Sequence, residues 1–231
     1  MYPNVQAYDR GVMFNPDGRL FQVEYAKEAV RKGATSIGLI AKDSVVFVAH
    51  KNITEPLAIP ATIQKVFRID SHIGATYSGM VADGLHIIDV ARNGAQNHRL
   101  VYDDVKSVEA LAKDISAYMM QATQYGGLRP YAVSFLVGGI DTTPRLFEIE
   151  PGASFLGYKA DAIGVGKKTA TEILLKEYKD NISFDDAIRL GIKIIRKISE
   201  DKLVKESLDI GYVESGSDYK LLSSEEISQY L

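Results

Sequence analysis

Strand-like segments follow one another in this chain instead of alternating singly with helices. Four of them, rich in Val and Ile, precede the first pair of long helices: Thr35–Ala41, Val45–Ala49, Val66–Ile69 and Ile73–Ser78. The first two are separated only by Lys42-Asp43, which is typical of a hairpin turn. Runs of strands beside runs of helices favour antiparallel sheets over the parallel sheet of an alternating βαβ chain.

The rest of the sequence continues this grouping. Four stretches carry apolar residues at helical spacing: about 81–97, 105–122, 168–178 and 184–200. Four further segments are strand-like: 131–138, 144–149, 210–213 and 219–221. Ser223 and Glu226 form a capping box for a short last helix. We predict an α+β fold with an antiparallel double sheet covered by helices on both sides, and no linker divides residues 1–231, which we expect to form one domain.

The N-terminal region has a different character. Residues 1–18 are polar and contain the tight-turn sequence Asn15-Pro16-Asp17-Gly18. A helix is predicted over 19–32, with Gly33 as its stop. Its apolar residues cover more than one face, which is typical of a helix that packs between partners within the fold or across a subunit contact.

Composition excludes several kinds of chemistry. The chain has no cysteine, which rules out disulfides and thiol catalysis and favours a reducing compartment. A formal net charge of −3 provides no basic excess for nucleic acid or anionic membranes. The N-terminus lacks the apolar segment of a signal peptide, and the longest apolar runs are too short to span a bilayer. We therefore expect a cytoplasmic protein without nucleic-acid or membrane partners.

Candidate ligand motifs are weak. The four histidines show no paired metal-ligand spacing, so neither a metal nor a cofactor is expected. Gly164-Val165-Gly166-Lys167-Lys168 has a superficial likeness to a phosphate-binding loop, but Asp161 stands where that motif needs glycine and Lys168 where it needs Ser or Thr. A strand end followed by a helix start is the preferred interpretation.

One motif is far more specific. Tyr8-Asp9-Arg10 and the stretch from Phe14 through Asn15-Pro16-Asp17-Gly18-Arg19-Leu20-Phe21-Gln22-Val23-Glu24-Tyr25-Ala26 resemble the N-terminal signature of proteasome α-subunits. Two later segments fit the same family: Gln124–Tyr131, and Ile69-Asp70 leading to Ser78–Asp83. The resemblance covers essentially the whole chain and looks archaeal.

The resemblance implies a four-layer αββα sandwich of the N-terminal nucleophile hydrolase type. It also implies a non-catalytic subunit of the 20S core particle, in which seven copies form an outer ring above the β-subunits. Such a ring gates the passage of unfolded protein substrates and docks regulatory AAA ATPases that end in a hydrophobic–tyrosine–any motif.

Catalysis in the family's β-subunits needs a threonine at a freed N-terminus, whose own amine serves as base. Aligned on Ile37-Gly38, the nucleophile position in this chain is Ala34, which has no hydroxyl. Thr35 stands one place away, and one place along a strand moves a side chain to the other face. A β-type protease with Thr35 as nucleophile stays open as an alternative, as does a lone, monomeric binding or scaffold domain.

By resemblance, Lys65 lies in the pocket that receives the carboxylate of the activator's C-terminus. A long, mobile ammonium suits that role; a solvated lysine at a strand start is the alternative. The remaining wall of this activator-docking pocket matches five further positions: Gly18, Lys27, Gly33, Gly79 and Met80. Arginine is frequent in the family where Lys27 stands, so bidentate binding would be lost here.

Two other functional regions follow from the resemblance. The gate is expected to consist of a flexible tail, residues 1–12, held by a cluster of five residues: Tyr8, Asp9, Arg10, Pro16 and Tyr25. The rim of the substrate channel matches four consecutive residues: Tyr125, Gly126, Gly127 and Leu128. Glycine lets several backbones approach an axis closely, although the same two glycines also serve to end a helix.

Overall fold

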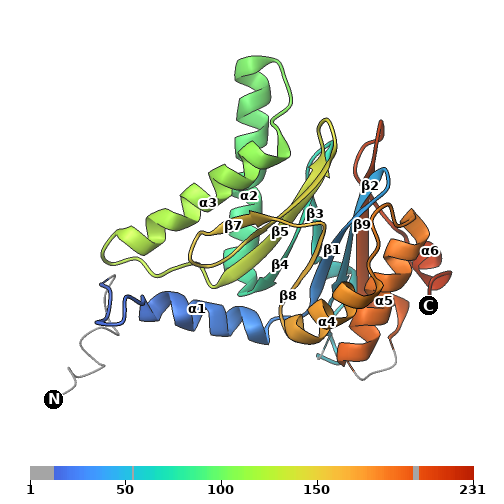
Figure 1. Ribbon diagram of the computed structural model, residues 1–231, viewed down its shortest axis with the longest axis horizontal. Helices are drawn as coiled ribbons and strands as arrows, with labels where there is room; N and C mark the ends of the chain where they lie inside the picture. Colours follow the sequence, from blue (N-terminus) through green and yellow to red (C-terminus); the bar gives the residue numbers. More distant parts are fainter. Residues whose placement is uncertain (1–12, 54, 200–202) are drawn as a thin grey trace.

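Two five-stranded sheets lie face to face between helices in the computed structural model, which describes residues 13–53, 55–199 and 203–231 (Figure 1). The strand order is β10-β9-β2-β1-β8 in the first sheet and β3-β4-β5-β6-β7 in the second. Each of these pairings is antiparallel, which confirms the prediction from the grouped strands. Short hairpins allow this arrangement, whereas parallel neighbours need long crossovers.

The first sheet is built from β1 (Ser36–Ala41), β2 (Ser44–His50), β8 (Ala160–Ile163), β9 (Leu208–Glu214) and β10 (Lys220–Leu221). The second consists of β3 (Val66–Asp70), β4 (Ile73–Gly79), β5 (Val133–Ile140), β6 (Pro144–Ile149) and β7 (Phe155–Gly157). Their facing surfaces enclose buried side chains that include Phe47, Leu136 and Leu146. Full burial of one such side chain stabilises the fold by about 1.5–3 kcal/mol.

Helices cover both outer faces. α2 (Val81–Tyr102) and α3 (Val108–Gln124) pack on the second sheet, and α4 (Lys167–Glu177) and α5 (Phe184–Ser199) pack on the first. The last helix, α6 (Ser224–Ser228), has the predicted Ser223–Glu226 capping box. Short 3₁₀ turns cover Pro60–Thr62 and Lys205–Ser207. The result is the four-layer αββα arrangement expected from the sequence (Figure 1).

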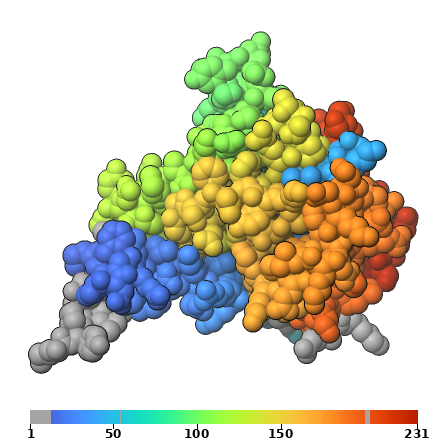
Figure 2. Space-filling model, in the orientation of Figure 1, coloured from blue at the N-terminus to red at the C-terminus, as the bar shows by residue number. Residues whose placement is uncertain are grey.

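Helix α1 (Phe21–Lys32) lies across one end of the sandwich and forms an exposed ledge there (Figures 1 and 2). Val23, Ala26 and Val30 face the interior, while Tyr25 is exposed on the outer side. The helix ends where predicted, but Gly33 has φ −72°, not a left-handed conformation. Glycine is needed there because a Cβ would lie 2.3 Å from the Ser78 hydroxyl oxygen.

Several predicted boundaries were wrong for identifiable reasons. Strand β7 was missed because a three-residue segment is too short to show a period, and β8 was predicted only through its end before Gly164. Helix α2 runs on to Tyr102, and Val105 lies in the turn before α3 instead of inside a helix. Leu85 lies in the predicted apolar stretch 81–97, yet its side chain is 44% exposed.

Candidate functional site

A cavity of about 480 Å³ surrounds the segment that leads into β3. Lys65 and Ile63 come from this segment, Tyr77 and Gly79 from β4, and Ala34 from the residues before β1. Val81 and Leu85 of α2 add apolar surface to the same cavity. The exposure of Leu85 therefore has a structural reason: its side chain borders this cavity instead of the helix–sheet core.

Lys65 is a buried lysine, so the alternative of a solvated side chain at a strand start is wrong. The residue is only 7% exposed. Its Nζ donates a hydrogen bond to the Tyr77 carbonyl oxygen at 2.7 Å and lies 4.5 Å from the centroid of the Tyr77 ring. Burial lowers the pKa of Lys65 to about 8, although the charge of Asp209 acts in the opposite direction. An ammonium has three N–H groups, so donors remain for a second acceptor.

A second lysine shares the same carboxylate. Lys51 Nζ lies 2.8 Å from one oxygen of Asp209, whose other oxygen accepts the Lys65 backbone N–H at 2.7 Å. Asp209 belongs to β9 and so connects the first sheet to the start of β3 in the second. With both lysines protonated, this group has one more positive charge than negative, which suits an anionic group placed in the cavity.

Other predicted docking residues are distributed over two places. Gly33 and Gly79 lie together, since a Cβ on Gly33 would be 2.5 Å from the Gly79 backbone nitrogen. Met80 follows directly as the exposed residue before α2. Gly18 instead lies in the turn before α1, and Lys27 forms an ion pair with Glu150 at 3.3 Å beside a different cavity. A single chain therefore does not bring the six together.

Ala34 and Thr35 point to different surroundings. Ala34 borders the cavity that contains Lys65. Thr35 is 1% exposed, and its hydroxyl donates a hydrogen bond to the Val165 carbonyl oxygen at 2.6 Å. The threonine hydroxyl is thus held in a structural contact with the segment before α4.

The predicted gate residues are described only in part. Tyr8, Asp9 and Arg10, with the rest of residues 1–12, lie outside the described residues. Pro16 occupies the expected turn, which is closed by a hydrogen bond from Gly18 N–H to the Asn15 carbonyl oxygen at 2.9 Å. Gly18 has φ +75°, the left-handed conformation that glycine adopts without strain. Tyr25 stacks on Phe21 on the outer side of α1.

The predicted channel-rim residues form an exposed loop directly after α3. Tyr125 and Leu128 both point outward, and added Cβ atoms on Gly126 and Gly127 would meet nothing within 4 Å. Gly127 has φ +87° and needs to be glycine for that reason. The loop is fastened behind its tip, because both Arg129 Nη atoms donate to the carboxylate of Asp83 in α2 at 2.7 and 2.8 Å.

Neither a metal site nor a membrane span is found in residues 13–53, 55–199 and 203–231. Among them no group of three or more His, Cys, Asp or Glu side chains is arranged to hold a metal ion. Within the same ranges no helix has the length and apolar character needed to cross a membrane.

Comparison with known proteins agrees with this architecture. Residues 30–213 match the proteasome subunit family, and residues 8–29 match the N-terminal signature of A-type proteasome subunits. The proteasome alpha subunit of Archaeoglobus fulgidus is 47% identical over 97% of this chain and 92% of its own length. The proteins of the same name from Methanoregula boonei and Methanocaldococcus jannaschii are 41% and 43% identical, over 100% and 97% of this chain and 98% and 87% of their own lengths.

The double sheet between helices defines the class: an αββα sandwich of the N-terminal nucleophile hydrolase type. The chain belongs to the proteasome subunit family, and the A-type N-terminal signature together with these relatives makes it an α-type member.

Proposed function

We propose that this chain is a structural and gating subunit of the 20S proteasome core particle and supplies no catalytic group. The observation that carries the proposal is that Ala34 comes just after the packed helix α1 in the chain. Ala34, which has no hydroxyl, borders the cavity beside Lys65, and a packed helix precedes it in the chain. A β-type enzyme would need a nucleophile there and a free α-amine next to it.

Ring assembly is the second part of the proposal. Seven copies would form the outer ring, with β-subunits beneath it, in the cytoplasm. Support comes from α1, whose exposed Tyr25 stacks on the half-buried Phe21 while the opposite side of the helix is buried. Native mass spectrometry of the purified chain should give seven times the mass of one chain, and a stable monomer would contradict the ring.

Activator docking is assigned to the cavity beside Lys65. Ile63, Val81 and Leu85 give its border an apolar character, and Lys51 and Lys65 supply positive charge behind it. A peptide with a hydrophobic side chain and a terminal carboxylate is complementary to both features. In a ring, Gly18 and Lys27 of a neighbouring copy would complete the pocket that the single chain leaves incomplete.

The gate is proposed to be residues 1–12, held by Tyr8, Asp9, Arg10, Pro16 and Tyr25, above a channel rim formed by residues 125–128. Deleting residues 2–11 leaves the Asn15–Gly18 turn and α1 in place. With β-subunits present, the shortened particle should degrade casein several-fold faster than the full-length particle, and short peptides should gain less because they need a smaller opening. Equal casein rates in particles of equal assembly would refute the gate.

A further inference from the structure

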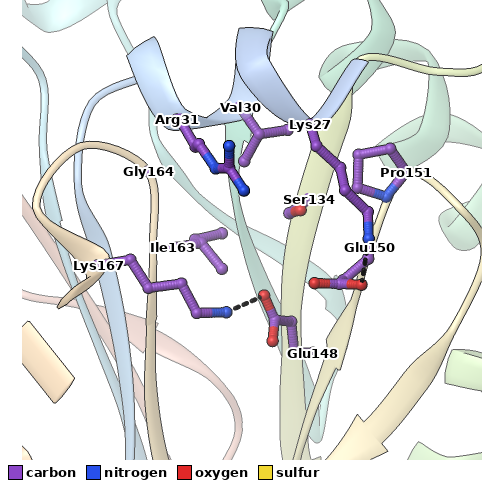
Figure 3. Close-up of a pocket in the computed structure, with 10 residues that line it drawn as sticks. All are labelled: Lys27, Val30, Arg31, Ser134, Glu148, Glu150, Pro151, Ile163, Gly164 and Lys167. Carbon is purple, nitrogen blue, oxygen red and sulfur yellow. Dashed lines mark hydrogen bonds and ion pairs between the residues drawn. The ribbon is translucent and has the colours of Figure 1, made fainter. Parts of the chain in front are cut away.

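A cluster of three charged residues connects the two sheets beneath α1. Glu148 lies on β6 of the second sheet, Asp161 on β8 of the first, and Lys167 begins α4. A cavity of about 290 Å³ separates Glu148 and Lys167 from α1, and Figure 3 shows the Lys167 ammonium directed at the Glu148 carboxylate across its floor.

The cluster contains more carboxylates than cations. Glu148 is 5% exposed and Asp161 6%. Lys167 Nζ lies 2.5 Å from Glu148 Oε1 and 3.7 Å from Asp161 Oδ2. If both carboxyl groups were ionised, one negative charge would remain uncompensated in a buried site, which is strongly unfavourable.

The neighbouring cations do not supply the missing charge. Lys27 on α1 pairs with Glu150, as Figure 3 also shows, and Arg31 pairs with Glu28 on its own helix. The other titratable group facing Glu148 is Tyr158, in the turn between β7 and β8. Lys27 and Arg31 thus each already have an acidic partner.

An unsatisfied atom shows where a proton fits. Among the described residues, the buried Asp161 Oδ2 has no hydrogen-bond partner, although it lies near both Lys167 and Glu148. A carboxylate oxygen can only accept, so two ionised carboxylates cannot bond to each other. One proton on the pair would create that bond and remove the excess charge together.

We propose that Glu148 and Asp161 share one proton beside Lys167 and that this proton fastens the two sheets together beneath α1. The cluster is therefore a proton-linked clamp. Burial first, and then the neighbouring Asp161 charge, raise the pKa of Glu148 to about 7 against the opposing effect of Lys167.

The sign of the pH effect follows from proton linkage. Glu148 binds its proton more tightly in the folded chain than in the unfolded chain, where its pKa is the ordinary 4.5. The stabilisation is complete below that ordinary pKa and is lost as the pH rises to the folded value of about 7. Above that range the clamp holds an uncompensated charge.

Glu148→Gln tests the clamp, because a glutamine amide keeps the shape and permanently donates a hydrogen bond as the protonated acid does. Thermal unfolding should be compared for the wild-type and variant full chains in the same assembly state. The midpoints should agree at about pH 4.5, and the variant should unfold roughly 2–4 °C higher at about pH 8.5. A purely packing role for Glu148 predicts instead the same difference at both pH values, and that result would overturn the proposal.

Glu150→Gln is the matched control: it changes a glutamate on the same cavity that already has a full partner in Lys27. It should keep the wild-type pH profile. Infrared difference spectra give a second readout, since the shared proton predicts a protonated-carboxyl band near neutral pH that Glu148→Gln removes and Glu150→Gln retains. A wild-type spectrum without that band would also contradict the clamp, even if a variant failed to fold.

Discussion

Two lysine–carboxylate clusters in this protein have opposite charge imbalances. Around Lys65, two ammonium groups share the single carboxylate of Asp209. Around Lys167, one ammonium faces the two carboxyl groups of Glu148 and Asp161. Each cluster joins one sheet to the other, yet burial lowers the pKa of Lys65 to about 8 and raises that of Glu148 to about 7.

The difference between the clusters shows what burial does to charge. Desolvation disfavours every charged form, and an unmatched charge has no partner to offset that cost. An unmatched lysine therefore tends to lose its proton and an unmatched carboxylate tends to gain one. The Lys167 cluster can neutralise itself internally with a shared proton. The Lys65 cluster retains its extra positive charge at neutral pH and borders a cavity where an anion can compensate it.

Asp209→Asn should produce the largest effect, because it removes the carboxylate that pairs with Lys51 and that accepts the Lys65 backbone N–H. Losing charge-assisted hydrogen bonds of this kind should cost about 1.5–3 kcal/mol of unfolding free energy. Denaturant titration would measure it. Asp180→Asn, which breaks the exposed Lys159–Asp180 pair, is the control and should change stability by less than about 0.5 kcal/mol. If both variants lost the same unfolding free energy, the Asp209 contacts would contribute no more than an exposed ion pair, which would contradict the prediction.

Lys65→Ala tests whether the excess positive charge serves docking. Without it, the affinity of assembled particles for a peptide ending in the hydrophobic–tyrosine–any motif should fall roughly ten- to a hundredfold, the value of a charge-assisted contact to a carboxylate. Fluorescence anisotropy of a labelled peptide measures this. Lys159→Ala removes an exposed lysine elsewhere and should leave affinity unchanged. If Lys65→Ala particles bound the peptide as tightly as wild-type particles, the cavity beside Lys65 would not be the docking site.

Raising the pH should have the smallest effect and should act on the two clusters in opposite directions. Above pH about 8 the Lys65 amine becomes neutral, so peptide affinity should fall several-fold between neutral and alkaline pH. Over the same interval the Lys65 contribution to unfolding free energy should rise, because the unfolded lysine still binds its proton up to its ordinary pKa of 10.5. Lys65→Met should remove this rise above about pH 8 while keeping the fall that Glu148 causes up to about pH 7. A pH profile of unfolding free energy unchanged by Lys65→Met would refute the lowered pKa of Lys65.

The sequence predicted the grouped strands and the layer order because hairpins and amphipathic helices leave local patterns. The Lys42-Asp43 turn, β6 over Pro144–Ile149 and the Ser223–Glu226 capping box are examples that the structure confirms. The very short strand β7 was missed because three residues show no period, and β8 was predicted only through its end, since its existence depends on pairing with the distant β1.

The site was predicted less completely for the same reason. Lys65 was found through its family motif, but its surroundings depend on Tyr77, which accepts from its amine, and on Asp209, which accepts its backbone N–H and is 144 residues away. No local pattern connects Lys51 to that carboxylate. The Glu148–Asp161 pair likewise depends on β6 and β8 meeting across the two sheets, and Asp161 was considered only as a mismatch to a phosphate-binding loop.

The absence of a catalytic group in this chain can be tested most directly by assaying hydrolysis of a fluorogenic peptide with the purified chain alone, and then with β-subunits added. The chain alone should be inert. Thr35→Ala should leave the activity of the assembled particle unchanged, because the Thr35 hydroxyl donates a structural hydrogen bond to the Val165 carbonyl oxygen. Hydrolysis by the isolated chain that Thr35→Ala abolishes would contradict the account and establish a threonine protease instead.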